Sequence, residues 1–161
     1  MADGVTFKLE GAEELNKKLK GLSNDLKYKG GRFALRKAGA IVLKAAKANA
    51  EKVDDLSTGQ SITDNLALRW SPQRFKSTGD LMFRVGVMRG AKFPPKGTPP
   101  DKGFNSPTPH WRLLEFGTEK MSAKPFMRQA LENNVGAATR EFITQYDKAI
   151  DRYLKKIAKG K

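Results

Sequence analysis

The fold is decided by the stretch His110-Trp-Arg-Leu-Leu-Glu-Phe-Gly-Thr-Glu-Lys-Met-Ser-Ala-Lys-Pro-Phe-Met-Arg-Gln-Ala-Leu-Glu132, which contains an element end, a turn and a helix start. Gly117 closes the first element and supplies a backbone conformation that a side chain disfavours. The residue before a proline is held in extended geometry, so we expect a helix to begin at Pro125. Phe126 then lies on the first turn, where it can pin that helix against a sheet. We interpret the stretch as a junction in the core, with direct contact to a partner as the alternative. The candidate residues are Glu115, Phe116, Gly117, Thr118, Pro125 and Phe126.

The sequence after Pro125 predicts one long C-terminal helix. Its apolar residues recur at helical spacing and form a continuous stripe. The stripe consists of Leu131, Val135, Ala138, Phe142, Tyr146, Ala149, Ile150, Tyr153 and Ile157. Basic residues gather in the last ten positions, where they complement the negative end of the helix dipole.

Residues 90–109, before the junction, hold most of the eight prolines and are expected to form an extended loop. Proline removes a backbone donor, so neither a helix nor a central strand is expected there. Long loops of this kind are usually functional or become ordered on a partner. The loop is also basic, so we expect acidic neighbouring subunits to contact it.

Two alternating stretches predict an antiparallel hairpin. Apolar residues occupy every second position from Leu81 to Val87, and a second strand is expected around Leu66 to Trp70, joined to the first by residues 72–79. Alternation at Val5, Phe7 and Leu9 predicts a further strand at the N-terminus. An amphipathic helix is expected from Ala12, and the glycines at 30 and 31 are expected to break it.

A second helix after these glycines is expected to have a small-residue face and a basic face. The small face consists of Ala34, Ala38, Ile41, Ala45 and Ala48, and no acidic residue occurs between Leu26 and Ala50. The opposite face holds Arg32, Arg36, Lys37, Lys44 and Lys47. Such a face can follow a phosphate backbone or an acidic partner. The alternative is an ordinary solvated face.

Length and charge bound the class of protein. The chain of 161 residues is expected to form one domain, 1–161, and its 31 Lys and Arg against 17 Asp and Glu give a net charge of +14. That charge favours an anionic partner without naming it. No apolar run approaches the roughly 20 residues of a membrane helix, and the N-terminus lacks a secretion pattern, so we expect synthesis in the cytosol and no membrane.

The residue inventory argues against an enzyme. There is no cysteine, and His110 is the single histidine, without a recognisable catalytic partner in the sequence. Glu13 with Glu14 and Asp54 with Asp55 are adjacent carboxylates whose side chains point in different directions. The glycine pair at 30 and 31 lacks the spacing of a phosphate loop. We therefore expect no catalysis, no metal and no cofactor.

The stretch 110–132 resembles the signature of phage head-tail joining, neck or tail-completion proteins. This family includes relatives of the lambda tail-completion protein Z and of the Hong Kong siphophage gene-product-ten-like proteins. The resemblance lies in Glu-Phe-Gly-Thr, a short basic turn, and Ala-x-Pro-Phe opening a long helix, and the order of elements agrees more loosely over most of the chain. The chain departs from the family after Thr58-Gly59, where Gln60-Ser61-Ile62 replaces the common early Leu and Arg.

The resemblance implies a structural virion protein of a long-tailed phage. Its copies would form a homo-oligomeric ring, such as a hexamer, that completes the tail or joins it to the head. The implied partners are the head-side connector, the tail terminator or tail-tube proteins, and phage DNA passing through the lumen. The implied location is the neck or the top of the tail, after assembly in the host cytoplasm. A basic DNA-binding protein is the alternative, and a small nuclease or toxin is a weaker one.

The expected fold class is α+β. A small, mainly antiparallel sheet is expected to pack against two or three helices, with a long C-terminal helix and a long Pro/Gly-rich loop.

Overall fold

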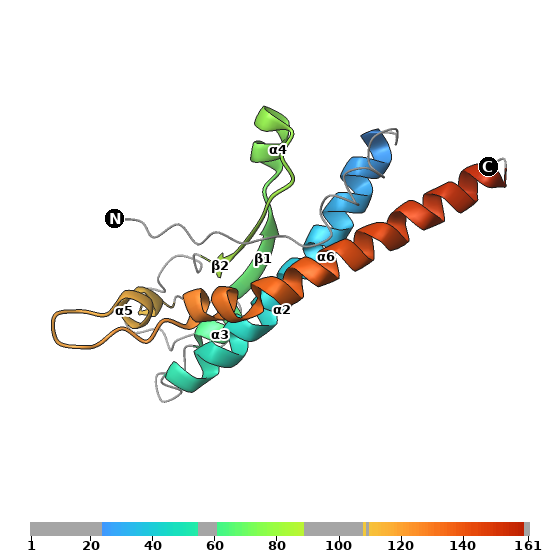
Figure 1. Ribbon diagram of the computed structural model, residues 1–161. Coiled ribbons are helices and arrows are strands. Elements are labelled where there is room, and N and C mark those ends of the chain that lie inside the picture. Colours follow the sequence, from blue (N-terminus) through green and yellow to red (C-terminus); the bar gives the residue numbers. More distant parts are fainter. Residues whose placement is uncertain (1–23, 55–60, 89–107, 109, 160–161) are drawn as a thin grey trace.

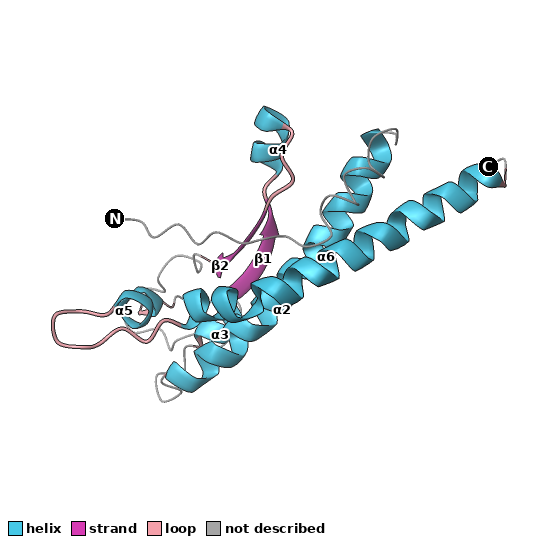
Figure 2. Cartoon of the chain, viewed as in Figure 1, coloured by secondary structure: helices cyan, strands magenta, loops and turns pink. Residues whose placement is uncertain are grey.

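The computed structural model describes residues 24–54, 61–88, 108 and 110–159 (Figure 1). The elements are α2 (Asn24–Val53), α3 (Ile62–Asn65), β1 (Leu66–Trp70), α4 (Pro72–Thr78), β2 (Phe83–Val87), α5 (Trp111–Phe116) and α6 (Phe126–Ala158). Figure 2 shows two long helices beside one small sheet. The expected α+β class, with an antiparallel sheet and a long C-terminal helix, is confirmed. The predicted strand at 5–9, the start of the helix from Ala12 and the loop 90–109, apart from residue 108, lie outside the described residues.

Helix α2 runs without a break through Gly30 and Gly31, so the expected helix end at these residues is wrong. Both glycines are buried. A Cβ at Gly30 would lie 3.2 Å from the ring of Tyr146, and one at Gly31 would lie 2.8 Å from Cδ1 of Leu81. The pair therefore lets neighbouring elements approach the helix closely, at the modest propensity cost of glycine inside a helix.

Helices α2 and α6 pack antiparallel through ridges that repeat every fourth residue. The ridge of α2 consists of Leu26, Gly30, Ala34, Ala38, Ala46 and Ala50. The ridge of α6 includes Phe126, Ala130, Tyr146 and Ile150. One cluster joins the start of α2 to the end of α6, and a second joins the end of α2 to the start of α6. Ridges of this spacing incline to the helix axis, so the two helices cross obliquely (Figure 1).

This geometry corrects two details of the predicted stripes. Ala48 was predicted to lie on the small-residue face but is exposed, whereas Ala46 and Ala50 are buried. The buried residues repeat every fourth position, and a row with this spacing winds slowly around the helix instead of running straight along it. Leu131 of α6, predicted to lie in the core stripe, is 51% exposed. Tyr146 is buried as predicted, and its hydroxyl donates to the carbonyl of Lys27 at 2.9 Å. Burial raises the pKa of this phenol, so it remains a donor in the alkaline range.

The hairpin places its apolar side chains on one face. The paired residues are Leu66 with Val87, Leu68 with Val85 and Trp70 with Phe83, in an antiparallel register. The predicted strands are confirmed, but their connection holds a helix, α4, which ends at Gly79 with φ 77°.

Aromatic rings hold the hairpin and its connecting helix α4 against α2. Phe75 of α4 contacts Trp70 and Tyr28, with ring centroids 5.6 Å and 5.1 Å apart, and the guanidinium of Arg32 lies 4.5 Å from the Trp70 ring. The hairpin and α4 are therefore anchored on α2 by rings from both elements.

The ridge makes a prediction about matched alanines of α2. Ala50→Leu should destabilise the protein by about 1–3 kcal/mol, because Ala50 is fully buried in the cluster that joins α2 to Phe126 and Ala130 of α6 and the added side chain has no space there. Ala48→Leu, two residues away on the exposed side, should change the free energy of unfolding by less than about 0.5 kcal/mol. Urea unfolding followed by circular dichroism measures both. Equal effects would show that the two helices do not pack along this ridge.

Candidate functional site

Glu115 of α5 caps the first turn of α6. Its side chain is nearly fully buried, and its carboxylate accepts hydrogen bonds from the backbone N–H groups of Phe126, Met127 and Arg128 at 2.8, 3.0 and 3.1 Å. These donors have no partner inside the helix, and the positive end of the helix dipole favours a carboxylate there. One side chain from a preceding helix therefore determines where α6 begins.

Arg128 completes this cap on the outer side. Its Nε donates to the Glu115 carboxylate at 3.1 Å, and its Nη2 donates to the Glu115 carbonyl at 2.5 Å. Its side chain is 55% exposed, and its guanidinium lies 5.4 Å from the ring of Phe116. The ion pair thus joins a buried carboxylate to a cation at the surface.

Gly117 makes the cap possible by turning the chain after α5. It has φ 76°, and a Cβ there would lie 2.8 Å from the backbone N of Ala123 and 2.9 Å from the carbonyl O of Met121. Both are backbone atoms that cannot move aside. The N–H of Thr118 donates to the same Met121 carbonyl at 2.8 Å and closes the turn. The expected special conformation of Gly117 is confirmed.

The six candidate residues of the motif separate into two groups. Phe126 is buried against Ala46, Ala50 and neighbouring apolar residues, and Pro125 directly precedes α6. With Glu115 and Gly117 these residues build the junction, while Thr118 is exposed. Phe116 differs most, because its side chain is 65% exposed.

An apolar groove of about 710 Å³ opens beside Phe116, between the hairpin, α2, α5 and α6. Its largest apolar lining residues are Leu35, Val42, Leu68, Phe83, Val85, Trp111, Phe116, Met127, Leu131, Val135 and Phe142. Sequence reasoning missed this groove because it assigned Leu131, Val135 and Phe142 to the core stripe.

The five basic candidates of α2 do not form one uniform surface. Arg32 is engaged with the Trp70 ring and supports the hairpin. Arg36, Lys37 and Lys44 are exposed, and Lys47 is half-buried. Arg32 therefore has a structural role, and the other four remain candidates for contact with an anion.

The described residues show no arrangement typical of a metal centre. His110 Nε2 lies 3.0 Å from a carboxylate oxygen of Asp54, whose other oxygen accepts the N–H of Ile62 at 2.7 Å. The pair ties the start of α5 to the end of α2. Within the described ranges, no group of three or more metal-ligating side chains occurs. The described helices also lack a stretch long and apolar enough to span a bilayer.

A protein-family model described as "Bacteriophage HK97-gp10, putative tail-component" matches residues 13–117. The chain belongs to the HK97-gp10-like family. Searches of curated proteins and of solved structures find no match. The matched region includes α2, the hairpin and α5 and ends at Gly117, so Glu115 lies inside it and the capped helix α6 lies beyond it. Membership of this phage tail-component family assigns the chain to the virion.

The cap predicts a large effect of Glu115→Ala. The substitution leaves three N–H groups of α6 without their acceptor, so the free energy of unfolding should fall by about 3 kcal/mol. Glu119→Ala, at an exposed glutamate in the following turn, should change it by less than about 0.5 kcal/mol. Thermal and urea unfolding measure both variants. A Glu115→Ala protein as stable as the control would show that the Glu115 hydrogen bonds do not stabilise the start of α6.

Gly117 gives an independent test of the same junction. Gly117→Ala should destabilise the protein by more than about 1–3 kcal/mol, because the backbone strain adds to a clash with backbone atoms. Gly86→Ala is the matched control, since a Cβ there meets nothing within 4 Å. The control should be neutral or stabilising by up to about 1 kcal/mol. Comparable destabilisation at both positions would contradict the strained turn.

Proposed function

We propose that the chain is a structural subunit of the head-tail junction of a long-tailed phage, where its copies form a ring that completes the tail or joins it to the head. Family membership supports a tail component. The observation that carries the assembly role is the apolar groove with the exposed Phe116 at its edge. The proposed function is geometric and uses neither catalysis nor a cofactor.

The groove is suited to a protein neighbour. Soluble proteins seldom expose a large apolar surface, and such surfaces usually mark sites of protein association. Aromatic residues and arginine are enriched where proteins meet, and Phe116 lies beside Arg128 at the edge of the groove. Phe116 and Leu131 would become largely buried if a neighbour filled the groove.

The proposed occupant is α5 of a second copy. A closed ring needs two different surfaces of the same chain that fit each other. The groove is one of these surfaces, and Leu113 of α5, which is 50% exposed and not part of the groove lining, would be the apolar side chain that enters the groove of the next copy. Repeating this head-to-tail contact closes a ring when the rotation between copies permits it. The ring would then present its two ends to the head-side connector and to tail proteins.

Two single variants test the head-to-tail contact. Leu131→Asp should disable the groove and Leu113→Asp the opposing surface, so each variant alone should be monomeric by light scattering while wild type forms a closed oligomer. A one-to-one mixture restores one intact contact and should give dimers. Leu154→Asp, at an exposed leucine near the far end of α6, is the control and should assemble normally. Full assembly of the two groove-contact variants would rule out this interface.

Deletion of the gene tests the role in the phage. Heads filled with DNA and separate tails should accumulate, and a plasmid copy of wild type or Leu154→Asp should restore joined particles. The Leu131→Asp copy should fail. Electron microscopy of the lysate is the measurement, and infectious particles without any copy of the protein would refute the proposed function.

A further inference from the structure

A second surface, away from the apolar groove, gathers cations from both long helices. On α2, Phe33, Arg36, Lys37, Lys44 and Lys47 fall on one side of the helix at 100° per residue. Arg36, Lys37 and Lys44 are exposed there. No acidic residue occurs in α2 from Leu26 to Ala50, so this part of the helix has no carboxylate beside these cations.

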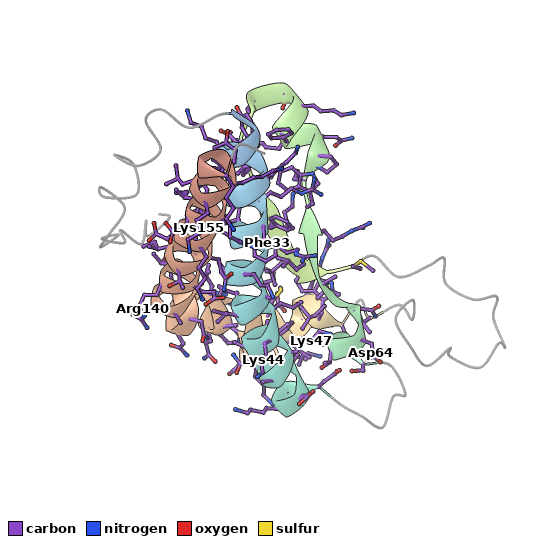
Figure 3. All side chains as sticks on the ribbon, turned by 90° about the vertical axis from the view of Figure 1, so that its right-hand side faces the viewer. Phe33, Lys44, Lys47, Asp64, Arg140 and Lys155 are labelled. Carbon is purple, nitrogen blue, oxygen red and sulfur yellow. The ribbon has the colours of Figure 1, made fainter. Side chains whose placement is uncertain are left out.

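Helix α6 extends this basic side at Phe33. A shallow groove of about 410 Å³ is lined by Phe33 of α2 and by Gln145, Lys148, Asp151, Arg152 and Lys155 of α6. The charged atoms of Arg36 and Lys37 lie 5.9 Å and 5.8 Å from the Phe33 ring. Figure 3 shows Phe33 and Lys155 next to each other on neighbouring helices, with Lys44 and Lys47 farther along α2. Five cations and one carboxylate thus surround a single ring, which we call the Phe33 groove.

These cations are not neutralised within the described part of the chain. The three ion pairs found there lie elsewhere, at Arg74, His110 and Arg128. Arg152 donates to the carbonyl of Lys148, and Asp151 is the one carboxylate that lines the groove, so the cations there outnumber the carboxylates. Neighbouring like charges repel each other, and an anion that bridges them lowers this cost.

We propose that the Phe33 groove and the basic side of α2 bind the phosphate backbone of duplex DNA. From Phe33 to Lys47 the helix rises about 21 Å, a length over which each DNA strand presents about six phosphates. Lysine is depleted in protein interfaces, so a lysine-rich surface suits a polyanion better than a protein neighbour. This inference goes beyond the assembly role and does not depend on it.

The structure changes the set of contacts that the sequence indicated. Arg32 is removed because it lies over Trp70, and Lys148, Arg152 and Lys155 are added because α6 brings them beside Phe33. No base-reading side chain is required, so the contact is independent of sequence. DNA held only through its phosphates can slide along the surface.

Duplex binding by two variants with equal net charge tests the proposal. The groove variant carries Arg36→Gln, Lys37→Gln, Lys148→Gln and Lys155→Gln, and the control carries Arg69→Gln, Lys76→Gln, Lys120→Gln and Lys124→Gln. All eight residues are exposed, so folding should be preserved, which circular dichroism checks. Fluorescence anisotropy with a 30-base-pair duplex of arbitrary sequence gives the affinity at several salt concentrations.

The groove variant should bind DNA at least about tenfold more weakly, and the slope of log affinity against log salt should fall by about one unit for each phosphate that the variant no longer binds. The control should stay close to wild type. Equal weakening in both variants would attribute binding to net charge alone and overturn the proposal. Tighter binding of a poly-glutamate peptide than of the duplex, at matched charge, would assign the groove to an acidic protein instead.

If the groove variant does not fold, the pairs Arg36→Gln with Lys37→Gln and Lys148→Gln with Lys155→Gln are tested separately. Each pair should produce about half of the change in salt dependence, because each removes two of the four cations. If only the α2 pair changed the salt dependence of DNA binding, α6 would have no part in the site, and the proposal of a groove formed by both helices would be overturned. The oligomeric state of each variant, measured in the same samples, separates a failure of DNA binding from a failure of assembly.

Discussion

The hydrogen bonds of the Glu115 carboxylate fix the position of α6 relative to the rest of the described fold. A buried carboxylate is tolerated only when its charge is compensated, and here three backbone N–H groups and one guanidinium do so. Glu115 reaches these donors because Gly117 reverses the chain between α5 and α6. Substituting either residue disturbs the same contact, so Glu115 to Phe126 acts as one structural unit.

The small residues between α2 and α6 explain why the molecule keeps an open apolar groove. Glycine and alanine bring the helix backbones close together and leave little room for large side chains between them. Phe142, Val135 and Leu131 therefore reach the side of the contact and line the groove. The packing that stabilises the helix pair thus also leaves apolar surface for a neighbour.

Local patterns in the sequence predicted the parts of the fold that depend on local chemistry. The alternation from Leu81 to Val87 indicated a strand, and Gly117 indicated a turn, because both depend on neighbours in the chain. The predicted helix end at Gly30 and Gly31 was wrong, because the role of these glycines depends on Tyr146 and Leu81, which are distant in sequence. The cap by Glu115 was missed for that reason too, because a glutamate in an apolar run gives no sign of the N–H donors that lie 11 to 13 residues later.

Helix α2 separates two surfaces with opposite physical character. Ala38 and Val42 face the apolar groove, whereas Arg36, Lys37 and Lys44 face solvent on the basic side. Apolar association is little affected by moderate salt, while phosphate contacts weaken steeply as salt rises. In the proposed assembly, the subunits would stay together under conditions in which DNA is released. Under both proposals, a ring held by apolar contacts would let DNA move past it, because contacts to phosphates without base recognition allow a duplex to slide.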